Sequence, residues 1–259
     1  MIPETLIGAV LFVFGACIGS FLNVCIYRLP LSLSIVFPPS ACTQCKRPIA
    51  AWDNIPIISY LVLLGRCRHC RMPISMRYPL VELITGLSAV AVYINFGLTA
   101  ESLVYFVFIA SLIVVIFIDI DYQIIPDVIS LPGIPIFFLA SVFIVRATVT
   151  DSLLGILAGG GSLLAVAVIY RLITGKEGMG GGDIKLLAMI GALCGWQGVL
   201  FTIFTSSLAG TVVGMVIMAM QKKNMKLALP FGPFLSMGAI VYLFFGPELV
   251  AWYLNMLRS

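Results

Sequence analysis

Long apolar runs, interrupted by few charged residues, dominate this sequence of 259 residues. Apolar side chains make up 61% of the chain and charged side chains only 10%, and the mean hydropathy is +1.13. A single soluble domain could not bury so much apolar surface. In lipid, only helices of about 20 apolar residues or closed barrels satisfy every backbone hydrogen bond. Because the runs are continuous rather than alternating, the sequence predicts an all-α polytopic membrane protein.

We expect about eight transmembrane helices. The segments are 6–27, 79–96, 101–118, 128–145, 152–170, 184–196, 199–220 and 230–246. The first lacks the basic start and small-residue end of a signal peptide, so we interpret it as a retained span. Within it, Gly15 and Gly19 predict close packing against another helix. The segment 184–196 is short and bounded by glycines, so a re-entrant or tilted segment is an alternative. The tail 248–259 is expected in the membrane interface.

Residues 28–78 differ from the rest of the chain in being rich in Pro, Ser, Cys and basic residues. This segment contains two C-x-x-C pairs, Cys42, Cys45, Cys67 and Cys70, with 21 residues between the pairs. Four cysteines at such spacing are typical of a closed zinc site, and a segment of ~50 residues has too small a core to fold well without a staple. Two disulfides are the alternative and would require an oxidising compartment. His69, inside the second pair, is expected beside the metal rather than bound to it.

The distribution of charge predicts the orientation in the membrane. With eight helices, thirteen of the fifteen Lys and Arg residues fall on the side of residues 28–78, and only Arg146 and Arg258 fall on the other. The positive-inside rule then places the cysteine segment in the cytosol and both termini outside. Because the cytosol keeps thiols reduced, this orientation favours zinc over disulfides. The net charge of +4 comes without a dense basic run, so we expect no nucleic-acid partner.

Two short polar stretches are unusual in this apolar background. One is Asp119-Ile-Asp121-Tyr-Gln-Ile-Ile-Pro-Asp127, and the other is Gly178-Met-Gly-Gly-Gly-Asp183-Ile-Lys185. An ionised carboxylate beside hydrocarbon is costly, so such acids normally face a cavity, a partner or a reaction. The predicted topology places Asp119 and Asp183 at the same cytosolic face. When two carboxyl groups share a site, one keeps a proton while the other activates water, as in aspartic proteases.

The residues around these acids have other expected roles. Asp121 is two positions from Asp119 and should point to nearly the opposite side of a helix. Asp127 is expected to cap the next helix. The glycines, including Gly180 and Gly182, would let a peptide backbone approach Asp183. A Gly-rich stretch could equally be a linker or a loop that binds phosphate. A P-loop is disfavoured because no G-K-[ST] follows. Lys185 either biases which acid is ionised or is an ordinary interfacial lysine.

Several further motifs follow one another in a characteristic order along nearly the whole chain. They are Phe14–Pro30, Pro38-Pro-Ser40, both cysteine pairs, Asn54-Ile-Pro56, Tyr60-Leu61, Gly65-Arg66-Cys67, Arg77–Glu82, the D-x-D-x-x-x-x-P-D and G-x-x-D-x-K-L stretches, and Leu229–Leu235. In combination they resemble the bacterial type IV prepilin peptidases, also called leader peptidase/N-methyltransferases. The resemblance implies three parts: a first transmembrane helix (1–27), a cytosolic four-cysteine zinc domain (28–78) and a transmembrane aspartic peptidase domain (79–259).

The resemblance also implies an activity. The chain is expected to be a multi-pass aspartic endopeptidase of the bacterial inner membrane, with Asp119 and Asp183 as the catalytic pair and Asp121 as the fallback for the first. It would cut a type IV prepilin or type II secretion pseudopilin after Gly at the cytosolic face, and then N-methylate the new N-terminus with S-adenosylmethionine. Asn23, Arg28 and Glu82 are candidate methyl-donor residues. Their alternative roles are a packing hydrogen bond, an interface anchor and a partner for an arginine, respectively.

Three alternatives stay open from the residues alone. A peptidase without methyltransferase activity is one, because the sequence shows no Gly-rich loop typical of a cofactor site. An ion-coupled transporter would also use membrane acids and broken helices, but it favours acids near the midplane and related halves, and no internal repeat of that kind is evident. A non-catalytic zinc-bearing assembly factor would tolerate asparagine at positions 119 and 183.

Overall fold

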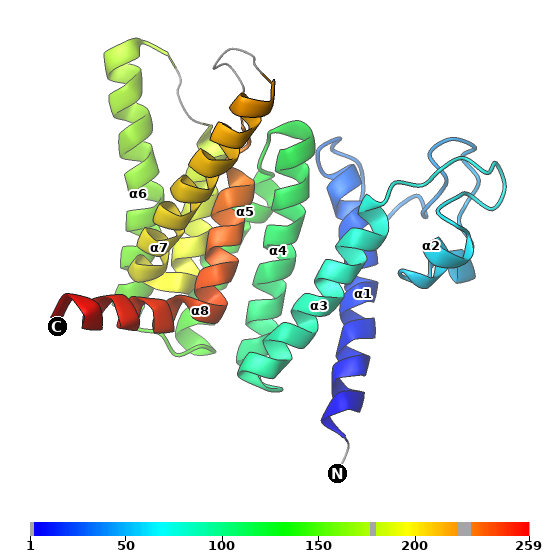
Figure 1. The fold of residues 1–259 in the computed structure, drawn as a ribbon, viewed down its shortest axis with the longest axis horizontal. Helices are drawn as coiled ribbons and strands as arrows, with labels where there is room; N and C mark the ends of the chain where they lie inside the picture. The colour runs from blue at the N-terminus through cyan, green and yellow to red at the C-terminus, as the bar shows by residue number, and fades with distance from the viewer. Residues whose placement is uncertain (1–2, 177–179, 222–228, 259) are drawn as a thin grey trace. The chain divides into compact units, whose positions relative to one another are not determined.

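The computed structural model describes residues 3–176, 180–221 and 229–258 (Figure 1). These residues form helices, turns and two isolated β-bridges, and no strand is present among them. The helices are α1 (Glu4–Arg28), η1 (Ala51–Asn54), α2 (Ile58–Val62), α3 (Arg77–Phe96), α4 (Ala100–Tyr122), α5 (Asp127–Phe143), α6 (Val149–Thr174), α7 (Gly181–Gln221) and α8 (Gly232–Arg258). The prediction of an all-α fold is therefore confirmed for the described residues.

Six of the eight expected apolar segments lie entirely within helices, and 128–145 and 230–246 extend two residues beyond α5 and α8, respectively. Within the described ranges, five helices are long and apolar enough to cross a membrane, namely α1, α3, α4, α6 and α7, while α5 and Gly232–Gly246 of α8 are shorter apolar helices. The segments 184–196 and 199–220 both belong to α7, which is interrupted at Gly195 by φ 68° and ψ −176°. The number of membrane crossings thus stays a prediction, and so does the interfacial location of the tail.

The chain forms two compact units, Met1–Val114 and Val115–Ser259, with the boundary inside α4. In the first unit, α1 packs closely against α3. A Cβ atom added to Gly15 would lie 2.8 Å from the Cβ of Ala89, and one added to Gly19 would lie 2.7 Å from the Cα of Glu82. The expected role of these two glycines in helix packing is therefore confirmed.

In the second unit, α7 is the central helix and packs against α5, α6 and α8. In its first half, Leu186, Leu187, Met189 and Ile190 are inaccessible to solvent. Close backbone approach, as at Gly155 of α6 and Gly191 of α7, allows this packing. The start of α7, which carries Asp183, is consequently held by the core that surrounds the rest of this half-helix.

Candidate active site

Asp119 lies near the end of α4 and is only 5% exposed. One of its carboxylate oxygens, Oδ2, accepts a hydrogen bond of 2.9 Å from the backbone N–H of Gly232, the first residue of α8. A Cβ atom at position 232 would lie only 2.6 Å from Oδ2. The absence of a side chain at Gly232 is therefore what lets the start of α8 reach the carboxylate.

Asp183 is the third residue of α7 and is partly buried. Its carboxyl group lies close enough to that of Asp119 for the two to interact electrostatically. The preceding residue, Gly182, packs against the linker between α4 and α5, since a Cβ atom there would lie 2.9 Å from the Cβ of Ile125. At Gly180, by contrast, a Cβ atom would meet none of the residues that the structure describes within 4 Å. Three helix ends, those of α4, α7 and α8, thus meet where the two carboxyl groups lie.

The other polar residues of the two stretches have different environments. Asp121 is exposed, whereas Asp119 is buried, as their spacing on one helix predicts. Lys185 forms an ion pair with Asp127, with 2.8 Å from Nζ to each carboxylate oxygen. The expected capping role of Asp127 is wrong: α5 begins at Asp127, Pro126 occupies the cap position, and no side-chain cap bond forms. The carboxylate is engaged by the lysine instead, and this pair joins the starts of α5 and α7.

Sequence reasoning missed Gly232 as a residue of the site. The available signal was a glycine between two prolines, Pro230-Phe-Gly-Pro233, at the start of the last apolar segment. Two residues of the Gly-rich stretch, Gly178 and Met179, lie outside the described residues.

The four cysteines form a second candidate site in the first unit. The Sγ atoms of Cys42, Cys45, Cys67 and Cys70 all lie within 4.8 Å of one another, and all seven cysteines of the chain, each in a described segment, are free thiols. The two C-x-x-C turns have the same backbone structure. In each, the first cysteine donates its N–H over 2.9 Å to a carbonyl five residues later, that of Arg47 or Met72. The cluster is thus built from two copies of one turn.

In each turn the backbone favours the thiolate form, which binds metals, at the first cysteine of the pair. The backbone N–H groups of Cys45 and Gln44 lower the pKa of Cys42 to about 6, and those of Cys70 and His69 lower the pKa of Cys67. His69 is not part of the cluster; its Nδ1 lies 3.3 Å from the guanidinium of Arg47. The donor set is therefore four sulfur atoms, as the sequence predicts.

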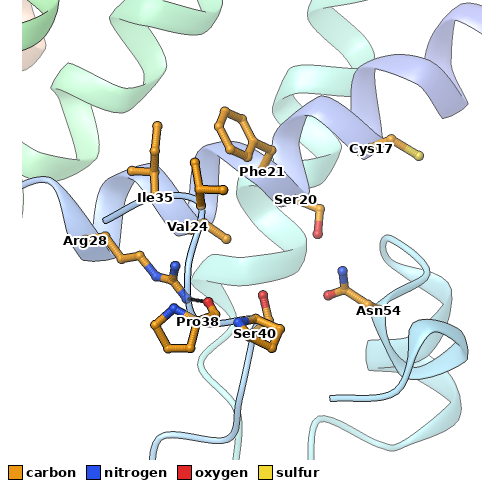
Figure 2. Close-up of a pocket in the computed structure, with 11 residues that line it drawn as sticks. Cys17, Ser20, Phe21, Val24, Arg28, Ile35, Pro38, Ser40 and Asn54 are labelled. Carbon is orange, nitrogen blue, oxygen red and sulfur yellow. Dashed lines mark hydrogen bonds between the residues drawn. The ribbon is translucent and has the colours of Figure 1, made fainter. Parts of the chain in front are cut away.

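The three candidate methyl-donor residues have different environments. Asn23 is buried and donates to the carbonyls of Gly19 and Tyr78, at 3.3 and 3.0 Å, which is its alternative packing role. Arg28 lines a pocket in the first unit, shown in Figure 2. Glu82 is buried and accepts a hydrogen bond from the backbone N–H of Ile57 at 2.7 Å.

Comparison with known proteins adds independent findings. Residues 13–96 match the family model of the bacterial peptidase A24 N-terminal domain, and residues 106–215 match that of the type IV leader peptidase family. Proteins named prepilin leader peptidase/N-methyltransferase are similar over almost the whole chain. The protein of Pseudomonas putida is 38% identical over 95% of this chain and 93% of its own length, and that of Aeromonas hydrophila is 37% identical over 95% and 93%. The protein of Pseudomonas aeruginosa is 37% identical over 93% and 91%. No solved structure matches the chain.

Proposed function

This chain belongs to the type IV leader peptidase family, and from that premise we propose that it cleaves type IV prepilins or pseudopilins and N-methylates the new N-terminus. Cleavage occurs after the Gly that ends the short leader, and the methyl group comes from S-adenosylmethionine. The similar proteins carry both activities in their name and align with 95% of this chain, which supports both halves of the proposal. The main structural support for the peptidase activity is the proximity of the carboxyl groups of Asp119 and Asp183 in the second unit.

In this proposal Asp119 and Asp183 form the catalytic dyad. One carboxyl group keeps its proton while the other, ionised, takes a proton from water as the water oxygen attacks the scissile carbonyl carbon. The protonated carboxyl group donates to the carbonyl oxygen, and a proton then passes to the leaving nitrogen. The N–H of Gly232 donates to Oδ2 of Asp119 and thereby helps to hold this carboxyl group in position. The absence of a side chain at Gly180 suits an extended peptide beside Asp183.

The proposed enzyme is a multi-pass protein of the bacterial inner membrane, with the cysteine segment and the dyad on the cytosolic side. With eight membrane crossings, thirteen of the fifteen Lys and Arg residues would lie on that side, which supports this orientation. The division into a first transmembrane helix (1–27), a zinc domain (28–78) and a peptidase domain (79–259) belongs to the same proposal. Its partners are the prepilin and the surrounding lipid.

We assign structural zinc to the four cysteines. Sulfur atoms placed tetrahedrally at about 2.3 Å from one ion lie about 3.8 Å apart, and the Sγ atoms of Cys42 and Cys70 are 3.8 Å apart. Four thiolates with no open position hold zinc as a structural rather than a catalytic ion. The metal would link the two turns and thereby stabilise a segment with little apolar core.

The proposed function is tested by prepilin cleavage in detergent or liposomes. Asp119→Asn and Asp183→Asn should each abolish cleavage, because asparagine can neither accept the water proton nor supply one. Asp121→Asn is the matched control, since it changes an exposed acid on the same helix, and it should cleave like the wild type. Cleavage by both dyad variants at the wild-type rate would refute the aspartyl mechanism. Labelled S-adenosylmethionine added to the same reactions tests the methyltransferase half, which fails if the cleaved product stays unlabelled.

A further inference from the structure

A pocket of about 280 Å³ lies between α1 and the segment that follows it (Figure 2). All the residues that line it belong to the first unit, whereas the dyad belongs to the second. The lining combines apolar side chains, hydroxyl and amide groups and one cation. From α1 come Cys17, Ser20, Phe21, Val24 and Arg28, and from the following segment come Ile35, Val36, Pro38, Pro39, Ser40 and Asn54.

Arg28 supplies a fixed positive charge at this pocket. Its Nη1 donates to the carbonyl of Ser34 at 2.8 Å and its Nη2 donates to that of Pro38 at 2.7 Å, so the guanidinium ties the end of α1 to the opposite wall. These bonds use two of the five N–H donors of an arginine. The remaining donors suit an anionic group such as a carboxylate, which a guanidinium can hold with two parallel hydrogen bonds.

Glu82 places a carboxyl group behind the pocket wall. It is 8% exposed and lies beside Ser20, which itself lines the pocket. Its carboxyl group accepts a hydrogen bond from the backbone N–H of Ile57 at 2.7 Å. Both neighbouring groups are neutral, whereas a buried carboxylate is normally compensated by a cation. A cationic ligand in the pocket would provide that compensation.

The turn that supplies the Ile57 N–H is strained. Ile57 has φ 63° and ψ −50°, and the N–H of Ile58 donates to the carbonyl of Pro56 at 2.6 Å, which together define a γ-turn. This conformation is a genuine outlier for a β-branched residue, and such strain concentrates at ligand-binding and catalytic sites. Asn54, three residues earlier, points into the pocket from the side opposite α1 (Figure 2). The turn therefore holds both Glu82 and Asn54 in place at the pocket.

We propose that this pocket binds the amino-acid and sulfonium part of S-adenosylmethionine. Arg28 holds the carboxylate of the donor, Ser20 faces its cationic groups with Glu82 behind it, and the apolar side chains cover its aliphatic chain. The volume is slightly below the ~300–1,000 Å³ of typical small-molecule sites, so the adenosine lies toward the open side. The bound donor supplies the methyl group. The neutral α-amine of the cleaved peptide attacks this methyl carbon. An N–C bond forms as the C–S bond breaks, and the electron pair of the C–S bond returns to sulfur. This inference rests on the methyltransferase half of the proposed function.

The first test maps the site in the full-length wild-type protein. Labelled S-adenosylmethionine is crosslinked to the protein in detergent by ultraviolet light, and the labelled peptides are identified by mass spectrometry. We expect the label within residues 17–54, and excess S-adenosylhomocysteine should abolish it. Label confined to residues 115–259 would overturn the inference without affecting the proposed function.

The second test measures binding and both activities in variants. Arg28→Gln and Glu82→Gln should each weaken S-adenosylhomocysteine binding, measured by calorimetry, at least tenfold, and reduce methyl transfer accordingly, with prepilin cleavage within twofold of the wild type. The matched controls Arg146→Gln and Glu101→Gln remove the same charges outside the pocket and should bind like the wild type. An analogue with an amine in place of the sulfonium should lose more affinity than S-adenosylhomocysteine in Glu82→Gln, because it carries the cation that the carboxyl group of Glu82 would compensate.

The outcomes distinguish the proposed donor-binding pocket from the proposed methyltransferase function. Normal donor binding by both pocket variants would overturn the inference while leaving the methyltransferase function intact. A wild-type enzyme that cleaves prepilin but neither binds the donor nor transfers methyl groups would refute that function and the inference with it. Retained cleavage in the variants also shows that they fold, so a loss of donor binding is not a loss of structure.

Discussion

Replacing Gly232 by alanine tests how the candidate dyad is held in position. Gly232 donates its N–H to Oδ2 of Asp119 at 2.9 Å. The added Cβ atom would lie 2.6 Å from Oδ2 and 3.1 Å from Cδ1 of Ile125. Gly232 begins a helix, and its φ is not positive, so alanine suits the backbone and the substitution acts through this contact.

The size of the effect follows from the distances. Separations below 3.0 Å are essentially never seen for a Cβ atom, and ordinary contact begins near 3.4 Å, so the start of α8 and the carboxylate must move apart by about 0.4–0.8 Å. Overpacking of this kind typically costs about 1–3 kcal/mol. Misplacing a catalytic group by ~1 Å can reduce the rate ~100-fold. We therefore expect kcat to fall on the order of 10- to 100-fold, equivalent to about 1.4–2.8 kcal/mol, with KM little changed.

Prepilin cleavage measured over a range of substrate concentrations separates kcat from KM. Gly161→Ala is the matched control, because a Cβ atom on that helical glycine would meet nothing within 4 Å, and it should cleave like the wild type. Thermal unfolding supplies a second readout. In an Asp119→Ala background the new methyl group no longer meets a carboxylate, so Gly232→Ala should cost less stability there than in the wild type. A kcat within twofold of the wild type, or equal stability losses in both backgrounds, would refute the argument.

Three further outcomes are expected. Elemental analysis of the purified protein should find one zinc per chain, and Cys67→Ala should lose it together with the thermal stability of the first unit; a metal-free wild type would contradict the zinc assignment. Lys185→Met should change the rate of cleavage less than fivefold. A double-mutant cycle with Asp127→Asn should give a coupling energy of about 0.2–1 kcal/mol that decreases with added salt, because the side chains of Lys185 and Asp127 are 34% and 58% exposed. A coupling energy above about 3 kcal/mol would show that the pair does more than join two helix ends. Gly19→Val should destabilise the packing of α1 on α3 by about 1–3 kcal/mol, whereas Gly8→Val, where the Cβ has open space, should have little effect; equal melting temperatures for the two variants would contradict the packing.

Much of the fold could be predicted from the sequence because its information is local. A run of about 20 apolar residues specifies a membrane helix whatever its neighbours are, and six of the eight expected segments lie entirely within helices. Gly15 and Gly19, four residues apart, mark a helix surface that another backbone can approach, and α3 does so. Likewise, the spacing of the four cysteines predicts a cluster because each C-x-x-C pair brings its two sulfur atoms together within a single turn.

The tertiary structure alone decided how the polar residues are paired. Gly232 and Asp119 are 113 residues apart, and no pattern near either one indicates that the start of α8 approaches the carboxylate. Asp127 follows a proline as a capping residue would, yet it pairs with Lys185, 58 positions away. Hydropathy and periodicity record whether a side chain is buried and in which kind of element. They do not record which buried groups meet, because that depends on how the helices pack: α7 and α8 around Asp119, and α3 against the Ile57 turn around Glu82.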